Sequence, residues 1–182
     1  MRRLCRSPPS VLELETLLEA YKGGFHHVDQ VFPNLYLGDV VIAGDKEKLK
    51  KMGVTHILNV AHCSWECRGD SIDYGPHIQY YGITAEDCPQ FNISRFLRPG
   101  AQFIHKAMST PNGKILVHCV LGKSRSATLV LAYLMIYQRF TLEEAVRHVS
   151  RFRCISPNRG FLEQLRNLET DLQHGLWGCH IL

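Results

Sequence analysis

The sequence predicts an α/β fold, in which helices flank a central, mostly parallel sheet. Two patterns carry this prediction. Short apolar runs such as Val54–Ala61 and Ile78–Ile83 alternate with segments whose apolar residues recur at helical spacing. The segment Ala127–Gln138 is apolar nearly all round, which is typical of a helix buried in the core. A length of 182 residues, 45% of them hydrophobic, indicates one globular domain.

The first expected element is a short amphipathic helix. Ser10 and Glu13 form a capping-box pattern, and apolar residues then recur at helical spacing until Gly23-Gly24. Periodicity leaves two alternatives open: the helix packs on the domain, or its apolar face contacts a partner or a second copy of the chain. The apolar residues concerned are Val11, Leu14, Leu17, Leu18 and Tyr21.

The later elements follow from the apolar pattern and from residues that begin or end secondary structure. Pro33 removes a ladder donor, so its strand is expected at a sheet edge. Gly53 suits the left-handed position that closes a helix, and Thr141 with Glu144 forms a second capping box. The expected strands are Val31–Leu37, Val54–Ala61, Ile78–Ile83 and Lys114–Val117, with a long loop over His62–Pro76. The expected helices are Asp45–Met52, Ser94–Met108, Ala127–Gln138, one after Thr141 with Leu142, Ala145, Val146, Val149 and Phe152 on one face, and one after Ser156-Pro157-Asn158.

Composition limits the classes of function. The chain has 21 basic and 17 acidic residues, a net charge of +4, which is too even for a general nucleic-acid binder. Its seven cysteines are scattered and odd in number, without an apolar leader before them, which favours a reducing compartment. The longest apolar run is far shorter than the roughly 20 residues of a membrane span. We expect a soluble cytoplasmic protein, with the nucleus as an alternative location, that contacts neither nucleic acid nor membrane.

The stretch His118–Ser126, His-Cys-Val-Leu-Gly-Lys-Ser-Arg-Ser, stands between an expected strand and the buried helix. Backbone N–H groups of such a loop, with those of the following helix turn, form a concave site that favours an anion. A helix N-terminus and a nearby guanidinium also favour the thiolate form of a cysteine. Cys119 at the start of the stretch and Arg125 near its end therefore suit attack on the phosphorus of a bound phosphate ester.

Each neighbour of Cys119 has an expected role. Gly122 lets the backbone turn with its N–H groups inward, and Arg125 holds two phosphate oxygens in a fork. Ser126 donates a hydrogen bond to the Cys119 sulfur, and His118 orders the loop through its ring nitrogens. No metal site is expected, because His118 lacks partner ligands nearby in the sequence. The expected phosphate-binding residues are Val120, Leu121, Gly122, Lys123, Ser124 and Arg125.

These residues carry a family resemblance. The pattern His-Cys-x5-Arg-Ser resembles the signature of cysteine-dependent protein phosphatases, and the run Ser126–Met135 is similar to their dual-specificity branch. So are Pro33–Gly38, Gly53–Asn59 and Ser156–Leu162. The match spans roughly Val28–Leu172 and looks closest to the small atypical members of the vaccinia-H1-related type, including the muscle- and testis-expressed ones.

The resemblance implies a fold and a domain division. The cysteine-dependent phosphatase fold has a sheet of about five strands. The catalytic domain is expected over residues 25–175, between an N-terminal segment of residues 1–24 and a C-terminal tail of residues 176–182.

The resemblance also implies a mechanism. Members of this type carry a general acid on a loop upstream of the cysteine, and Asp87, rather than Glu86, matches that position. Attack by the cysteine gives a cysteinyl phosphate, which water hydrolyses with Asp87 acting as base. Asn158 is expected to support the loop geometry. Arg153 is expected to add positive potential at the pocket rim, with a plain surface charge at a helix end as an equal alternative.

The expected function is a cofactor-independent, dual-specificity protein phosphatase in signalling, acting on phosphotyrosine and on phosphoserine or phosphothreonine, with MAP kinases among the candidate substrates. A loop with one lysine, Lys123, favours protein over lipid substrates. Two other classes are alternatives: a phosphoprotein-binding scaffold that is catalytically weak or inactive, and an enzyme acting on non-protein phosphate esters or in sulfur transfer. A further hypothesis pairs Cys88 with Cys119 in a reversible disulfide on oxidation.

Overall fold

The computed structural model describes residues 7–20, 26–63 and 74–177, with side chains up to residue 175. Its five strands are β1 (Val28–Phe32), β2 (Leu35–Gly38), β3 (His56–Asn59), β4 (Gln79–Gly82) and β5 (Ile115–His118). They form one sheet in the order β1-β2-β5-β3-β4, in which only β1 and β2 pair antiparallel. The expected α/β fold with a mostly parallel sheet of five strands is confirmed.

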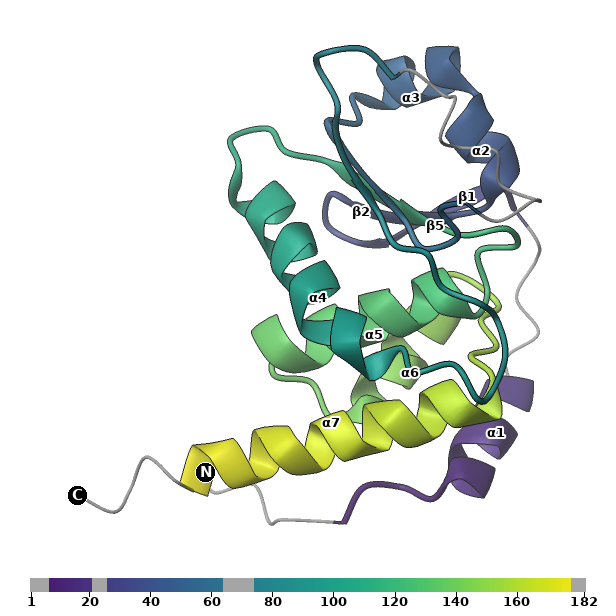
Figure 1. Ribbon diagram of the computed structural model, residues 1–182, viewed down its shortest axis with the longest axis vertical. Coiled ribbons are helices and arrows are strands. Elements are labelled where there is room, and N and C mark those ends of the chain that lie inside the picture. Colours follow the sequence, from purple (N-terminus) through teal and green to yellow (C-terminus); the bar gives the residue numbers. More distant parts are fainter. Residues whose placement is uncertain (1–6, 21–25, 64–73, 178–182) are drawn as a thin grey trace.

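Helices cover both faces of this sheet (Figure 1). On one side lie α2 (Val40–Gly44) and α3 (Lys46–Met52). On the other lie α4 (Ser94–Ser109), α5 (Arg125–Tyr137), α6 (Leu142–Ser150) and α7 (Arg159–Trp177). No helix of the described residues is long and apolar enough to cross a membrane.

The central strand β5 contributes to an apolar core on each face of the sheet. Side chains alternate between the faces of a strand. Ile115 and Val117 accordingly pack in the larger core, while Leu116 packs with Ile42 and Leu49 of the smaller one. Because β5 is buried on both sides, its carboxyl end, where Cys119 follows, is fixed by the two cores together.

The expected edge strand Val31–Leu37 is wrong, because this stretch contains the turn of a hairpin. β1 and β2 are joined through Pro33-Asn34, and Asn34 has a φ of 62°, a left-handed conformation that asparagine tolerates. β1 is one of the two edge strands, whereas β2 pairs in parallel with β5 inside the sheet. The register aligns Val28 with Gly38 and Gly38 with His118, so the hairpin brings the start of β1 toward the Cys119 stretch.

The apolar face of helix α1 (Val11–Glu19) packs on the domain, which is the first of the two expected alternatives. The expected capping box of Ser10 and Glu13 is present, and Leu14 is fully buried. The helix contacts α6 and α7, and Arg166 of α7 donates a hydrogen bond to Pro9 O at 2.6 Å. It ends at Glu19, and the expected extension through Tyr21 and Gly23-Gly24 lies outside the described residues.

Most other expected elements are confirmed within a few residues. Asp45 caps α3, Gly53 closes it with a φ of 72°, and Thr141 begins α6 with a capping box. Helix α2, which was not expected from the apolar pattern, begins after the N-cap Asp39. Phe152 does not belong to the buried face of α6, because that helix ends at Ser150 and the Phe152 side chain is 48% exposed. The expected loop over His62–Pro76 is described only at its two ends.

Candidate active site

Cys119 lies at the base of the loop that joins β5 to α5, residues 119–124, which we call the Cys119 loop. The side chain is 1% exposed. Its sulfur accepts hydrogen bonds from Gly122 N at 3.2 Å and from Ser126 Oγ at 3.1 Å, the latter as expected from the sequence. Two donors aimed at one sulfur stabilise negative charge on it.

Four consecutive carbonyl groups of the Cys119 loop are hydrogen-bonded from outside the loop. Because each carbonyl is turned outward, the opposite edges of these peptide units, which carry the N–H groups, turn toward the centre. A ring of inward N–H groups is an anion site that needs no lysine. The four bonds are Val40 N to Val120 O at 3.0 Å, Arg153 Nη2 to Leu121 O at 3.1 Å, Arg153 Nε to Gly122 O at 2.8 Å, and Ser156 N to Lys123 O at 2.8 Å.

Gly122 is the one position of this loop that only glycine fits. Its φ is 67°, in the left-handed region. A Cβ atom there would lie 2.3 Å from Gly38 O and 2.6 Å from Arg153 Nη2. The close approach of β2 and Arg153 to the loop therefore depends on the missing side chain.

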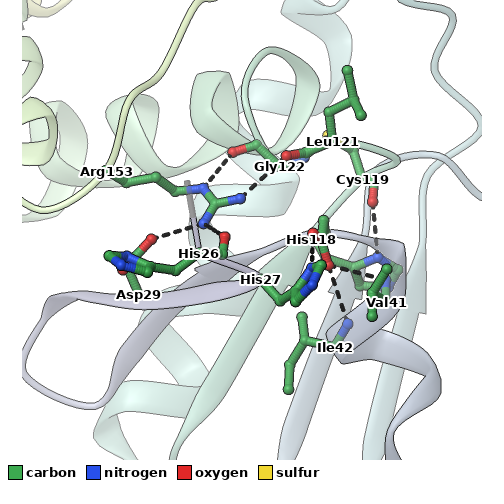
Figure 2. Close-up of polar contacts among 11 residues, drawn as sticks. His26, His27, Asp29, Val41, Ile42, His118, Cys119, Leu121, Gly122 and Arg153 are labelled. Carbon is green, nitrogen blue, oxygen red and sulfur yellow. Dashed lines mark hydrogen bonds and ion pairs between the residues drawn. The ribbon is translucent and has the colours of Figure 1, made fainter. Parts of the chain in front are cut away.

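Arg153 is a buried brace behind the Cys119 loop, so both expected placements, the pocket rim and the surface, were wrong. Its side chain is 2% exposed. In addition to its two loop carbonyls, Nη1 donates to His26 O at 2.7 Å and pairs with Asp29 Oδ2 at 2.8 Å (Figure 2). The hairpin makes this burial possible, because it carries a carbonyl and a carboxylate to the guanidinium.

Asp39 positions Val40, whose N–H group donates to Val120 O of the Cys119 loop. The buried carboxylate of Asp39 accepts hydrogen bonds from Val41 N at 2.9 Å and Ile42 N at 3.1 Å through Oδ1, and Oδ2 lies 2.7 Å from His27 Nδ1. This cap holds the first turn of α2 in place. Val40 N is thereby directed to the carbonyl of Val120.

His118 orders the loop through one ring nitrogen rather than through both. Its Nδ1 lies 3.3 Å from Cys119 O, whereas Nε2 has no hydrogen-bond partner among the described residues. Burial of the ring lowers the pKa of His118 to about 4. The imidazole is therefore neutral at physiological pH and adds no charge beneath the anion site.

The structure brings Asp87 to the mouth of the Cys119 loop. Asp87 Oδ1 accepts hydrogen bonds from Ser124 Oγ at 2.6 Å and Asn158 Nδ2 at 2.9 Å. Asp87 Oδ2 lies 3.5 Å from Arg125 Nε, an ion pair too long to be a good hydrogen bond. The carboxylate is 35% exposed, and Arg125 only 8%. An acid and a buried cation thus lie next to one another at the anion site.

Asn158 joins the acid to α7. It donates to Asp87, and its Oδ1 accepts from Phe161 N at 3.0 Å, which caps the helix. Its own N–H donates to Ser124 Oγ at 3.2 Å. One side chain therefore links the acid to the start of α7.

The remaining expected residues line the loop in different ways. The Leu121 side chain is 59% exposed, whereas Val120 and Lys123 are half-buried. Cys88 and Cys119 are both free thiols, so their pairing on oxidation stays a prediction. Within the described part of the chain, no three His, Cys, Asp or Glu side chains are grouped to hold a metal ion.

Several functional contacts were not found from the sequence. Asp39 after a strand is an N-cap signal that could have revealed α2. Asp29 and Val40 gave no signal, because their roles arise only when the hairpin and α2 pack on the loop.

Comparison with known proteins gives concordant matches. The family described as "Dual specificity phosphatase, catalytic domain" matches residues 35–171. Dual specificity protein phosphatase 26 of mouse is 49% identical over 167 residues, which cover 92% of this chain and 79% of that one. The crystal structure of human DUSP28 superposes with a TM-score of 0.73 at 32% identity, covering 81% of this chain and 96% of that one. A mouse putative dual specificity phosphatase complexed with zinc tungstate gives a TM-score of 0.73 at 29% identity, covering 85% and 93%.

Proposed function

The chain belongs to the dual specificity phosphatases and is a protein phosphatase, and we propose that the Cys119 loop and Asp87 carry out its reaction. One observation carries this assignment of residues. Four carbonyl groups of the loop are hydrogen-bonded from outside it, which leaves the N–H groups of the loop facing the Cys119 sulfur. Arg125 and Asp87 lie at the mouth of the same site. A phosphate ester seated there has a nucleophile, a charge clamp and a proton donor around one phosphorus atom.

In the first step the Cys119 thiolate attacks phosphorus, and the bond to the ester oxygen breaks. Arg125 and the loop N–H groups stabilise the charge on the phosphoryl oxygens. The departing oxygen takes a proton from Asp87. Because Asp87 Oδ1 already accepts two hydrogen bonds, we assign this proton to Oδ2.

In the second step water attacks the cysteinyl phosphate, and the S–P bond breaks. Asp87, now a carboxylate, takes a proton from the attacking water. The Cys119 sulfur leaves as a thiolate, which the hydrogen bonds from Ser126 and Gly122 stabilise. Inorganic phosphate is released, and the enzyme is back in its starting state, with Cys119 as a thiolate and Asp87 carrying the proton that it took from water.

The physiological substrates are proposed to be phosphoproteins of cytoplasmic or nuclear signalling, with MAP kinases among the candidates. Two features support a protein substrate. The loop contains a single lysine, Lys123, and the exposed Leu121 side chain presents an apolar surface that a lipid headgroup would not use. Substrate-trapping with Cys119→Ser in cell extracts is the means to identify them.

Hydrolysis of an aryl phosphate in EDTA tests the assignment. Cys119→Ser is expected to abolish turnover while phosphate still binds. Asp87→Asn is expected to slow turnover by about 10² to 10⁴-fold, the usual cost of losing a general acid. Wild-type rates in Cys119→Ser would remove Cys119 as the nucleophile, and a wild-type rate in Asp87→Asn would remove Asp87 as the acid.

A further inference from the structure

The segment that carries Asp87, from Thr84 to Ile93, is attached to α7 at its far end. We call this segment the acid loop. Gln164 of α7 donates from Nε2 to Phe91 O at 2.9 Å, and its Oε1 accepts from Ser94 N at 2.8 Å. Helix α4 begins at Ser94 and its N-cap residue, Ile93, makes no side-chain cap. Gln164 therefore satisfies an N–H group that the sequence of α4 itself leaves open.

A second contact joins the same two elements in the middle of the acid loop. A Cβ atom on Gly160 would lie 1.9 Å from Pro89 O and 2.8 Å from Pro89 Cα. The backbone of α7 thus touches the backbone of the acid loop, which only glycine allows. With Asn158 at Asp87, the first six residues of α7 and its cap meet the acid loop at three places, over about 9 Å of helix axis.

We propose that Gln164 is a positioning residue for Asp87. It does not contact the acid, but its two hydrogen bonds fix the end of the acid loop to α7 before substrate arrives. The inference rests on the proposed role of Asp87 as general acid.

The physical reason is that the acid loop is held by a few separate side-chain contacts: besides those to α7, Ser124 Oγ donates to Asp87 Oδ1 at 2.6 Å and Arg125 Nη1 donates to Ala85 O at 3.3 Å. Between Thr84 and Ile93 it contains no helix or strand, and the Asp87 side chain is 35% exposed. A catalytic group displaced by about 1 Å loses much of its effect, as much as 10²-fold. Releasing the Gln164 end lets the loop sample positions in which Oδ2 misses the departing oxygen, while the Cys119 loop stays intact.

Dependence on the leaving group separates this role from a structural one. A proton donor matters most when the departing alcohol is a weak acid, and least when it leaves easily as an anion. A mispositioned acid should therefore slow phenyl phosphate much more than p-nitrophenyl phosphate. A general loss of structure would slow both esters alike.

The experiment compares kcat for these two esters in Gln164→Ala, Gln164→Glu and Gly160→Ala. Gln164→Ala should lower kcat on phenyl phosphate by about 10 to 10²-fold and on p-nitrophenyl phosphate by clearly less, with vanadate affinity unchanged. Gln164→Glu keeps the acceptor for Ser94 N but loses the donor to Phe91 O, and should show the same pattern. Gly160→Ala pushes Pro89 from the other side and should reproduce it without altering Gln164.

The matched control is Gln102→Ala, since Gln102 is an exposed glutamine of α4 whose side chain makes no hydrogen bond with the described residues. It should leave both rates unchanged. The double variant Gln164→Ala, Asp87→Asn should be no slower than Asp87→Asn alone, because Gln164 acts through the acid. Thermal midpoints establish that each variant is folded at the assay temperature, and Gln164→Glu serves if the alanine variant is not.

Two results separate failure of this inference from failure of the proposed function. If Asp87→Asn shows the leaving-group pattern and the Gln164 variants lower both rates equally or neither, the positioning role is wrong and the acid assignment stands. If Asp87→Asn itself slows both esters equally, Asp87 is not the acid, and the positioning role falls with it.

Discussion

The Cys119 loop and the acid loop meet at one opening but are held in different ways. Four backbone carbonyls of the Cys119 loop are bound by α2 and by the segment after α6, and the latter is tied to β1 through a buried ion pair. The acid loop is joined to α7 by the side chains of Asn158 and Gln164, and to the Cys119 loop and the start of α5 by those of Ser124 and Arg125. Anion binding is therefore built into the core, whereas proton transfer depends on a few contacts near the surface.

This difference separates the expected effects of substitutions. A substitution behind the Cys119 loop should lower the stability of the fold and the anion affinity together. A substitution that releases the acid loop should lower the rate and leave stability and anion affinity unchanged, which is why the Gln164 variants are expected to keep vanadate affinity.

The largest effect on stability is expected from Arg153→Met. This change leaves Asp29 without its buried cation and two loop carbonyls without donors. Removing one partner of a buried ion pair typically costs about 3 to 5 kcal/mol. The free energy of unfolding in urea should fall by that amount, and vanadate affinity should fall with it.

Arg147→Met is the matched control. Arg147 pairs with Glu143 on the surface of α6, where the two side chains are 49% and 47% exposed. Such pairs contribute about 1 kcal/mol or less. Equal losses of stability in the two variants would show that Arg153 does not brace the Cys119 loop.

A smaller effect is expected on acidification, through His118. Burial lowers its folded-state pKa to about 4, from 6.5 for an ordinary histidine, so the folded protein binds fewer protons than the unfolded chain between these values. The stability that this ring contributes is complete above pH 6.5 and is lost as the pH falls toward 4, by roughly 3 kcal/mol in total.

This prediction is checked by measuring the free energy of unfolding of wild type and His118→Gln between pH 7 and pH 4.5. The slopes of this free energy against pH are then compared. The wild type should lose more stability over the range than the variant. His105→Gln, at an exposed ring stacked on Tyr137, should keep the wild-type slope. Parallel curves for wild type and His118→Gln would mean that the buried ring does not resist protonation.

Local signals in the sequence were sufficient for most of the fold. The capping boxes at Ser10 and Thr141 and the left-handed Gly53 were placed correctly, because each depends on its own neighbours. The hairpin was missed because Pro33 alone suggested one edge strand, while the turn depends on the left-handed Asn34 that follows.

The site was predictable to a similar degree. Cys119, Ser126 and Gly122 belong to one short motif, and the structure places them together. Arg153 could not be placed from sequence, because an arginine after a helix is usually exposed. Its burial follows from acceptors on the hairpin, more than 120 residues away in the chain.

Detection of the cysteinyl phosphate tests most directly whether Cys119 is the nucleophile. Wild-type enzyme mixed with an aryl phosphate, quenched in acid within the first turnover and digested, is analysed by mass spectrometry. With Cys119 as the nucleophile, a single phosphoryl group is expected on the peptide that contains Cys119, and it should disappear as turnover ends. A phosphoryl group on another residue, or turnover with none on Cys119 at any quench time, would contradict it.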